Sequence, residues 1–303
     1  MTSPPLLRRL SAPALRALIG LLIATFTGLA LAGPPLWEVR DDQGRLRAHL
    51  FGTVHLCRSD CYPLPDVVRA AFERSQVVAF ELDTTDPALT TALAAAGMLP
   101  EHRTLGDVVP ADLYAEVRAA VAQLGLPGEA LERMRPWFVA NWLTVAAADQ
   151  AGYRTDHGVE TVLNARARAA GKPVVALETV DRQIAALSSG GEAAHDLALR
   201  QTLGLVRDGR MSAYLRRVAS AWRQGDDDAL MAAMVEGLEA PAAEALLQEL
   251  IFTRNGEMAR RIDAMLAHPG RLFVAVGGAH MIGASGIPAE LARMGWGVER
   301  IDP

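Results

Sequence analysis

Cysteine and aromatic residues are scarce in this chain of 303 residues, and it contains no run of basic residues. Its two cysteines, Cys57 and Cys61, do not make a structural zinc site by themselves, because such sites typically combine two separate ligand pairs. Only 5% of the residues are aromatic and the net charge is −5, so nothing indicates binding to nucleic acid. Hydrophobic residues make up 50% of the sequence, which is enough to bury a large core.

A charge-free apolar stretch covers residues 17–31, but it is shorter than the about 20 residues that a membrane-spanning helix needs. Three arginines precede it, and Ala30-Leu31-Ala32 offers small residues in the positions of a cleavage site. This combination is typical of a secretory signal peptide, here over residues 1–32. We expect an exported protein, periplasmic or secreted, with no stable membrane span once the signal is cleaved. Retention of the segment as an uncleaved anchor is the alternative.

The two cysteines are four positions apart. In an oxidising compartment the default interpretation of Cys57 and Cys61 is a local disulfide. Both lie close to His55, so a metal-binding thiol pair is the second interpretation. A disulfide here stiffens the loop that carries His55.

Short apolar segments are separated by long stretches with helical periodicity. We expect strands at residues 36–40, 46–51, 77–83, 174–178, 272–276 and 296–301. Continuous apolar runs such as 77–83 are typical of strands buried on both faces, in a parallel or central position. Residues 87–268 are mainly helical, and Asp156 is placed to cap one of these helices. The pattern predicts an α/β fold: a central mixed β-sheet with flanking helices and a large helical insertion.

One signature occurs twice in the sequence. In each copy a predicted strand ends in glycine, and a histidine follows three residues after that glycine. The first copy is Gly52-Thr53-Val54-His55, and the second is Gly277-Gly278-Ala279-His280. Glycine lets the backbone turn or approach another group closely. Histidine can bind a metal or transfer a proton near neutral pH.

Two further predicted strands end in glutamate, at Glu81 and Glu178. Parallel neighbouring strands bring such residues to one edge of the sheet, where α/β proteins bind ligands. Together with His55 and His280 they form a ligand set for a divalent transition metal, or a general acid and base. The simpler interpretation is that each histidine only hydrogen-bonds a loop and that each glutamate is the first solvated residue after a strand. Asp83, two positions after Glu81, has the same two interpretations.

Arg254 and Asn255 begin a helical segment in which Met258 follows one turn later. An arginine near an apolar face needs a carboxylate or an anionic substrate group. Glu160 lies in the first turn of a predicted helix, where the helix dipole is a sufficient structural reason for an acid. The remaining histidines with no distinctive context are expected at the surface: His102, His157, His195 and His268.

In order and spacing, several segments resemble the TraB/GumN family, which is related to the Tiki proteins. The resemblance runs from Leu36 to about Ile301 and rests on residues 50–55, 62–65, 80–83, 158–160, 172–179, 254–255 and 276–280. It implies one TraB/GumN-like domain over residues 33–303, with a fold also found in erythromycin-esterase-like proteins. It also implies that the two Gly-x-x-His motifs and Glu81 form the active site. Tiki-type members cleave the amino-terminal part of a secreted protein and use manganese or cobalt.

The leading hypothesis is an exported metal-dependent hydrolase that acts on a peptide or protein substrate. His55, His280 and Glu81 hold a divalent ion, which is manganese, cobalt or zinc. Glu178 or Glu81 acts as general base, while Arg254 and Asn255 orient a substrate carboxylate or stabilise an oxyanion. One alternative is a metal-independent, esterase-like hydrolase with a histidine base. Another is a non-catalytic protein that binds a metal ion or haem.

Overall fold

The computed structural model describes residues 33–236 and 247–301. The expected signal peptide at residues 1–32 lies outside the described residues. Within the described part of the chain, no helix combines the length and the apolar character needed to cross a membrane.

A six-stranded mixed sheet forms the centre of the molecule, with strand order β4-β3-β5-β2-β1-β6. The strands β4, β3, β5 and β2 are parallel to one another, whereas β1 runs antiparallel to both of its neighbours. Central β5 is buried at every position, as its continuous apolar run predicts. The predicted α/β class and mixed sheet are confirmed. The strand bounds are Leu36–Arg40 (β1), Leu46–Thr53 (β2), Val77–Phe80 (β3), Val174–Ala176 (β4), Leu272–Gly277 (β5) and Gly297–Arg300 (β6).

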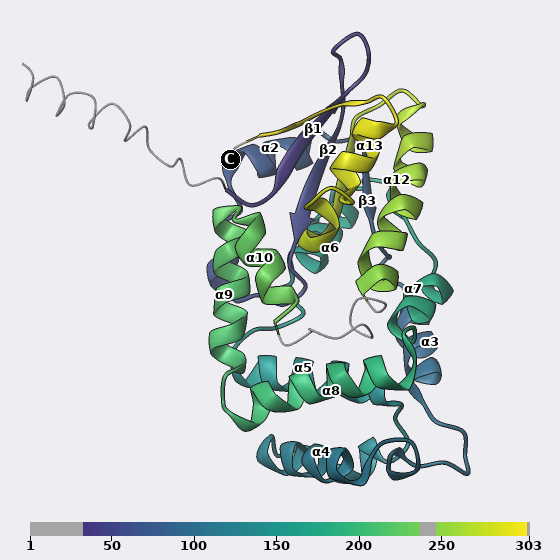
Figure 1. Ribbon diagram of the computed structural model, residues 1–303. Helices are drawn as coiled ribbons and strands as arrows, with labels where there is room; N and C mark the ends of the chain where they lie inside the picture. Colours follow the sequence, from purple (N-terminus) through teal and green to yellow (C-terminus); the bar gives the residue numbers. More distant parts are fainter. Residues whose placement is uncertain (1–32, 237–246, 302–303) are drawn as a thin grey trace, which may run out of the picture.

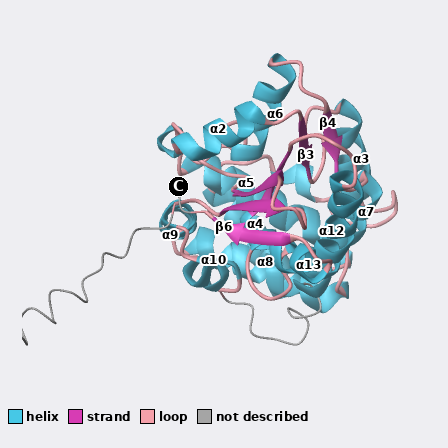
Figure 2. Ribbon diagram, turned by 90° about the horizontal axis from the view of Figure 1, so that it is seen from above, coloured by secondary structure: helices cyan, strands magenta, loops and turns pink. Residues whose placement is uncertain are grey.

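Helices cover both faces of this sheet and extend beyond its strand ends. Seen from above, α2 and α6 lie on one face and α12 and α13 on the other (Figure 2). Beyond the tip of β2, helices α5, α8 and α4 are stacked in layers (Figure 1). Helix bounds are Asp66–Arg74 (α2), Pro87–Gly97 (α3), Ala111–Gln123 (α4), Pro136–Gln150 (α5), Val159–Ala169 (α6), Val180–Leu187 (α7), Gly191–Arg207 (α8), Met211–Gln224 (α9), Asp227–Met234 (α10), Thr253–Leu266 (α12) and Ile287–Arg293 (α13). A π-helical turn, Gln248–Phe252, leads into α12.

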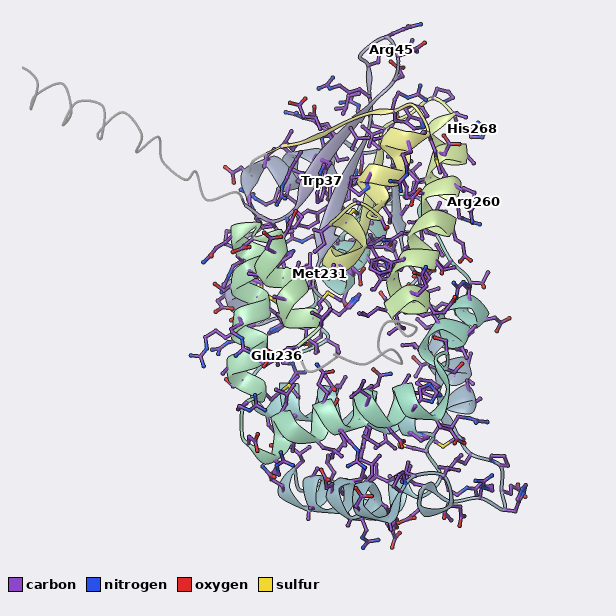
Figure 3. All side chains as sticks on the ribbon, viewed as in Figure 1. Trp37, Arg45, Met231, Glu236, Arg260 and His268 are labelled. Carbon is purple, nitrogen blue, oxygen red and sulfur yellow. A yellow bond between two sulfur atoms is a disulfide. The ribbon has the colours of Figure 1, made fainter. Side chains whose placement is uncertain are left out.

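The buried apolar residues form two separate clusters. The sheet core contains Phe51 on β2, which packs against Trp222 of α9 at 6.3 Å and Phe273 of β5 at 6.0 Å between ring centroids. The helical core lies among α4, α5, α8 and α9 and includes Leu113, Leu143, Leu199 and Leu203. Side chains fill the space within each layer, and Arg45 stands out at the tip of the β1–β2 hairpin (Figure 3).

Three details differ from the sequence predictions. Asp156 does not cap α6, because its carboxylate binds Arg154 at 2.9 Å and the helix begins only at Val159. The start of α6 is set by close docking instead: a Cβ on Gly158 would lie 2.4 Å from the carbonyl oxygen of His55. The strands β3 and β4 end earlier than predicted, at Phe80 and Ala176.

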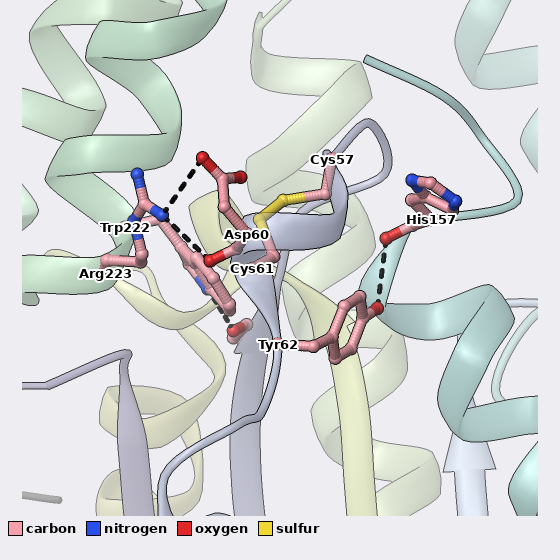
Figure 4. Close-up of a disulfide and its surroundings, with 8 residues drawn as sticks. Cys57, Asp60, Cys61, Tyr62, His157, Trp222 and Arg223 are labelled. Carbon is pink, nitrogen blue, oxygen red and sulfur yellow. Dashed lines mark hydrogen bonds and ion pairs between the residues drawn. A yellow bond between two sulfur atoms is a disulfide. The ribbon is translucent and has the colours of Figure 1, made fainter. Parts of the chain in front are cut away.

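The disulfide between Cys57 and Cys61 is present, as predicted (Figure 4). Of the four histidines expected at the surface, His102 and His268 are exposed. His157 and His195 are instead partly buried, and each has a buried ring nitrogen without a hydrogen-bond partner among the described residues. Helix packing around them was not visible in their local sequence.

Candidate metal and catalytic site

Four neighbouring parallel strands each deliver one of the predicted side chains to the same edge of the sheet. In spatial order β4, β3, β5 and β2, these are Glu178, Glu81, His280 and His55. The arrow of β2 points toward the layer of α5 and α8 (Figure 1), so this edge faces the helical section. The backbone stays paired just past β3 and β4, since Glu178 N–H donates to the Glu81 carbonyl at 3.0 Å. The two glutamates therefore start from adjacent positions.

Arg254, from the first turn of α12, joins the two glutamates in a buried network. Its Nη2 donates to Glu81 Oε2 and to Glu178 Oε2, each at 2.6 Å, and its Nε donates to Glu178 Oε1 at 2.9 Å. All three side chains are buried. Burial disfavours the guanidinium charge, but the hydrogen bonds to Glu178 and the attraction of both carboxylates raise the pKa of Arg254 further. Arg254 is thus a fixed positive charge.

His280 is held in one orientation by Asn255, the next residue of α12. The Asn255 amide nitrogen donates to the Ser285 carbonyl at 2.6 Å, which leaves its Oδ1 to accept from His280 Nδ1, also at 2.6 Å. The proton therefore sits on Nδ1, and Nε2 carries the lone pair, which accepts from Arg254 Nη1 at 3.4 Å. Burial, with repulsion from Arg254, lowers the pKa of His280 to about 4, so the ring is neutral at physiological pH. Its Nε2 lies 3.7 Å from Glu81 Oε2.

His55 is oriented in the same way by Glu160, in the first turn of α6. Its Nδ1 lies 2.6 Å from Glu160 Oε2, and Glu160 itself is buried. Attraction to Glu160, together with the hydrogen bond to it, raises the pKa of His55 to about 9. The ring remains 63% exposed, so its free edge is open to a ligand.

The loop that carries His55 is fixed to the start of α6 by backbone contacts. Val159 N–H donates to the Val54 carbonyl at 2.9 Å, and Arg154 N–H donates to the Cys57 carbonyl at 2.8 Å. Beyond the disulfide, the Tyr62 hydroxyl donates to the His157 carbonyl at 3.0 Å (Figure 4). These contacts place Glu160 beside His55.

Gly277, at the end of β5, brings the remaining donor atoms together. Its N–H donates to Glu81 Oε1 at 2.7 Å. A Cβ at this position would lie 3.2 Å from Glu81 Oε1 and 3.2 Å from His55 Nε2. Those distances are tighter than most carbon contacts, so the absence of a side chain here lets the two donor atoms approach.

These residues fit a divalent metal ion. Donor atoms of His55, Glu81 and Glu160 all lie within 4.8 Å of one another, a group that holds Glu160 where the sequence analysis expected His280. Glu160 Oε1 is buried without a hydrogen-bond partner among the described residues. Each histidine gives its Nδ1 to a side-chain oxygen, which is the usual arrangement of metal-binding histidines. Imidazole nitrogens and carboxylate oxygens together suit manganese, cobalt or zinc.

Glu160 is the site residue that the sequence reasoning missed. Its place in a first helical turn gave a sufficient structural reason, and only its membership of the segment 158–160 in the family resemblance pointed further. Asp83, by contrast, is taken up elsewhere: its carboxylate accepts from Asn164 at 3.1 Å and pairs with Arg168, both on α6. Glu178 and Asn255 are both in the cluster, but each is engaged by a neighbouring side chain.

Comparison with known proteins identifies the family of this chain. The model of the TraB/PrgY/gumN family matches residues 35–300. The chain belongs to the TraB/PrgY/gumN family. Among similar proteins, Metalloprotease TIKI1 of Danio rerio is 28% identical over 87% of this chain and 62% of its own length. Metalloprotease TIKI1 of Homo sapiens is 26% identical over 87% of this chain and 61% of its own length.

A bacterial member of the family covers a larger share of its own length. Uncharacterized protein YbaP of Escherichia coli K12 is 24% identical over 82% of this chain and 89% of its length. The chain spans about 62% of the length of the first TIKI relative that it matches. No solved structure matches the chain.

Proposed function

We propose that this protein is an exported, metal-dependent hydrolase of peptide bonds. The observation that carries the proposal is the paired orientation of His55 and His280: each is held through Nδ1. In His280 this turns Nε2 toward the buried carboxylate of Glu81, where Arg254 Nη1 also lies 3.4 Å from this nitrogen. Similarity to proteins named metalloproteases, over most of this chain, supports the same reaction class. The disulfide supports a location outside the cytosol, where such bonds persist.

In this proposal His55, His280 and Glu81 hold the ion. A bound divalent ion supplies Lewis-acid polarisation of the scissile carbonyl and lowers the pKa of water toward neutrality. Glu160 and Asn255 keep the two rings in the tautomer that presents Nε2. Both oxygens of Glu178 accept from Arg254, so Glu178 holds the arginine and is not free to act as a base.

Arg254 and Asn255 also act through their neighbours. The guanidinium of Arg254 is bound to Glu81, Glu178 and the Leu250 carbonyl, and the amide of Asn255 is bound at both ends. We assign them positioning roles in place of direct contact with substrate. Glu160 Oε1 is without a partner among the described residues, so we assign it the proton that the attacking water releases.

The metal-independent alternative is disfavoured by the charge states of the two histidines. A general base must be unprotonated near the working pH, with a pKa close to that pH. His55 has a pKa of about 9 and is protonated there, while His280 is neutral but has a pKa of about 4. Neither suits ester hydrolysis at neutral pH without a metal.

The test combines metal analysis with a peptidase assay. The purified protein should retain a divalent ion at one per chain and cleave an unstructured protein substrate. Chelation should abolish cleavage, and manganese, cobalt or zinc should restore it. Cleavage that survives complete metal removal would overturn the proposal in favour of the esterase-like mechanism. Bound metal or haem without turnover on any peptide or protein substrate would favour a binding protein.

A further inference from the structure

A second candidate site lies in the helical section, where a cavity of about 590 Å³ opens between α3, α5, α7 and α8. This volume is in the range of small-molecule and side-chain pockets. Its walls are mainly apolar, and none of the strand-end residues contributes to them. The polar groups that line it are Arg135, Trp137, Ser188, Glu192, His195 and Asp196.

Two of these groups have buried nitrogen atoms without a partner. Trp137 is only 5% exposed, and its indole Nε1 makes no hydrogen bond to any described residue. His195 Nε2 is also unpaired among the described residues, but the ring already donates to the backbone at Ser188 and Ser189, so Nε2 of the neutral ring is an acceptor and only Trp137 offers an N–H. A buried N–H without an acceptor costs about 1–3 kcal/mol, so native proteins rarely keep one unless something else satisfies it. A carbonyl oxygen of a bound molecule meets this need.

The charges on the cavity wall favour a cationic occupant. Glu192 and Asp196 lie one turn apart on α8, and neither forms an ion pair with another described residue. Glu192 lies in the first turn, where the helix dipole stabilises it, but Asp196 lies a turn further on. Burial raises the pKa of Asp196, and repulsion from Glu192 adds to this, although attraction to Arg200 acts in the opposite direction.

The neighbouring cations do not neutralise this pair. Arg200, one turn beyond Asp196, is engaged by Asp112 at 2.8 Å and Glu116 at 3.3 Å. Burial lowers the pKa of His195, so this ring adds no charge at neutral pH. Arg135 is exposed and is the single cation among the lining residues. The wall thus keeps an excess of negative charge.

Helix α7 connects this cavity to the strand-end site. It begins directly after Glu178 and Thr179, and Ile184 and the following Ser188 line the cavity. At 1.5 Å per residue along a helix, these two lining residues lie roughly 6–12 Å from the beginning of α7. Arg182 fastens α7 to α12 through Glu257 at 2.6 Å. An extended peptide covers that span in about two to four residues.

We propose that this cavity receives a lysine or arginine side chain of the peptide substrate, an inference that rests on the proposed peptidase function. The ammonium or guanidinium group pairs with Asp196 and Glu192. The aliphatic stem packs against the apolar wall. The indole N–H of Trp137 donates to a carbonyl oxygen of the peptide backbone.

The test uses two blocked pentapeptides that differ at one position, lysine in one and norleucine in the other. Binding is measured by calorimetric titration of the full chain after chelation, so that no cleavage intervenes. The lysine peptide should bind at least about tenfold more tightly, as expected for one new ion pair in a partly desolvated site. In Asp196→Asn the difference should fall below about threefold.

A matched control and a second variant keep the test decisive. Asp208→Asn, at the exposed far end of α8, should leave the lysine preference unchanged. Trp137→Phe, which removes the N–H donor together with part of the buried indole ring, should weaken both peptides alike. Circular dichroism of each variant confirms folding. Equal binding of the two peptides, or a preference that survives in Asp196→Asn, would overturn the assignment.

Cleavage assays separate this proposal from the peptidase proposal. Cleavage by the metal-loaded protein with no preference for a basic residue overturns the basic pocket and leaves the peptidase standing. Selective binding of the lysine peptide without cleavage under any metal supports the pocket and removes the peptidase.

Discussion

The sheet core and the helical core differ in what they bury besides apolar side chains. Among the described residues, every buried carboxylate, arginine and histidine lies on the sheet or on an element packed against its strand ends: His49, Glu81, Glu160, Glu178, Arg254 and His280. In the helical core, around α4, α5, α8 and α9, the buried polar residue is Thr202. Burying an ion costs several kcal/mol, and apolar replacements are often more stable. The contrast indicates that the strand ends are organised for chemistry at the expense of stability.

The largest expected effect on metal binding and activity comes from replacing the two strand-end histidines, whereas replacing a surface histidine should have no effect. His55→Ala and His280→Ala should each abolish metal retention and lower peptidase activity by at least about 100-fold, because each removes a ligand from one site. The double variant should be hardly worse than either single variant, since members of one unit are not additive. Metal content and kcat/KM are the measurements.

His102→Ala is the control, because His102 is exposed and outside the cluster. Thermal unfolding should show that all variants remain folded, since both rings lie past the strand ends. Full metal occupancy in either single variant contradicts a shared site.

Two arginines allow a direct comparison of the strand-end site with the helical section, because each arginine bridges two carboxylates. Arg254 joins Glu81 and Glu178 in the interior, whereas Arg200 joins Asp112 and Glu116 at the surface. Arg254→Met should lower the free energy of unfolding by about 3–5 kcal/mol, because it leaves buried carboxylates without a counterion. Arg200→Met should cost less than about 1 kcal/mol. Urea denaturation of both metal-free variants checks the difference, and similar losses would contradict it.

A third prediction concerns pH and metal affinity. In the metal-free protein His55 is protonated below its pKa of about 9, and a metal ion must displace that proton. Affinity should therefore rise about tenfold per pH unit from about pH 6.5 to about pH 9 and then level off. Titration calorimetry at several pH values measures this slope.

The same prediction can be sharpened with Glu160→Gln. Removal of the carboxylate beside Nδ1 should return the pKa of His55 toward its ordinary value, so affinity should level off near pH 6.5. A slope that continues unchanged to pH 9 in Glu160→Gln would show that Glu160 does not set the charge of His55.

The smallest effect is expected from the disulfide. Replacing Cys57 and Cys61 with serine should lower the free energy of unfolding by about 2 kcal/mol at most, because the closed loop is short. The loss should be concentrated in the loop after β2, so hydrogen exchange near His55 should increase more than in the helical core. Uniform acceleration over both cores would contradict a local role.

Much of the fold could be predicted from the sequence, because its signals are local. The central strands β3 and β5 have apolar runs with clear ends, and the rule for parallel sheets was enough to expect Glu81, Glu178, His55 and His280 at one edge. Pairings between distant side chains left no such signal. Arg254 meets Glu178 across 76 positions and Glu81 across 173.

The cap predicted for α6 failed for a related reason. Asp156 has the right residue type and spacing, but a tertiary contact between Gly158 and the His55 carbonyl determines where the helix starts. Glu160 was given a sufficient local explanation, although its partner is His55, which lies on another element. In both cases docking of α6 onto the loop after β2 outweighs the local preference.

The position of β5 has a consequence for synthesis of the protein. This strand enters between β3 and β2, and Gly277 contacts Glu81 across 196 positions of sequence. Until the ribosome has made residues 272–280, the two flanking strands have no partner between them and His280 does not exist. A growing chain therefore cannot hold the complete set of proposed ligands before β5 and the turn after it have been made.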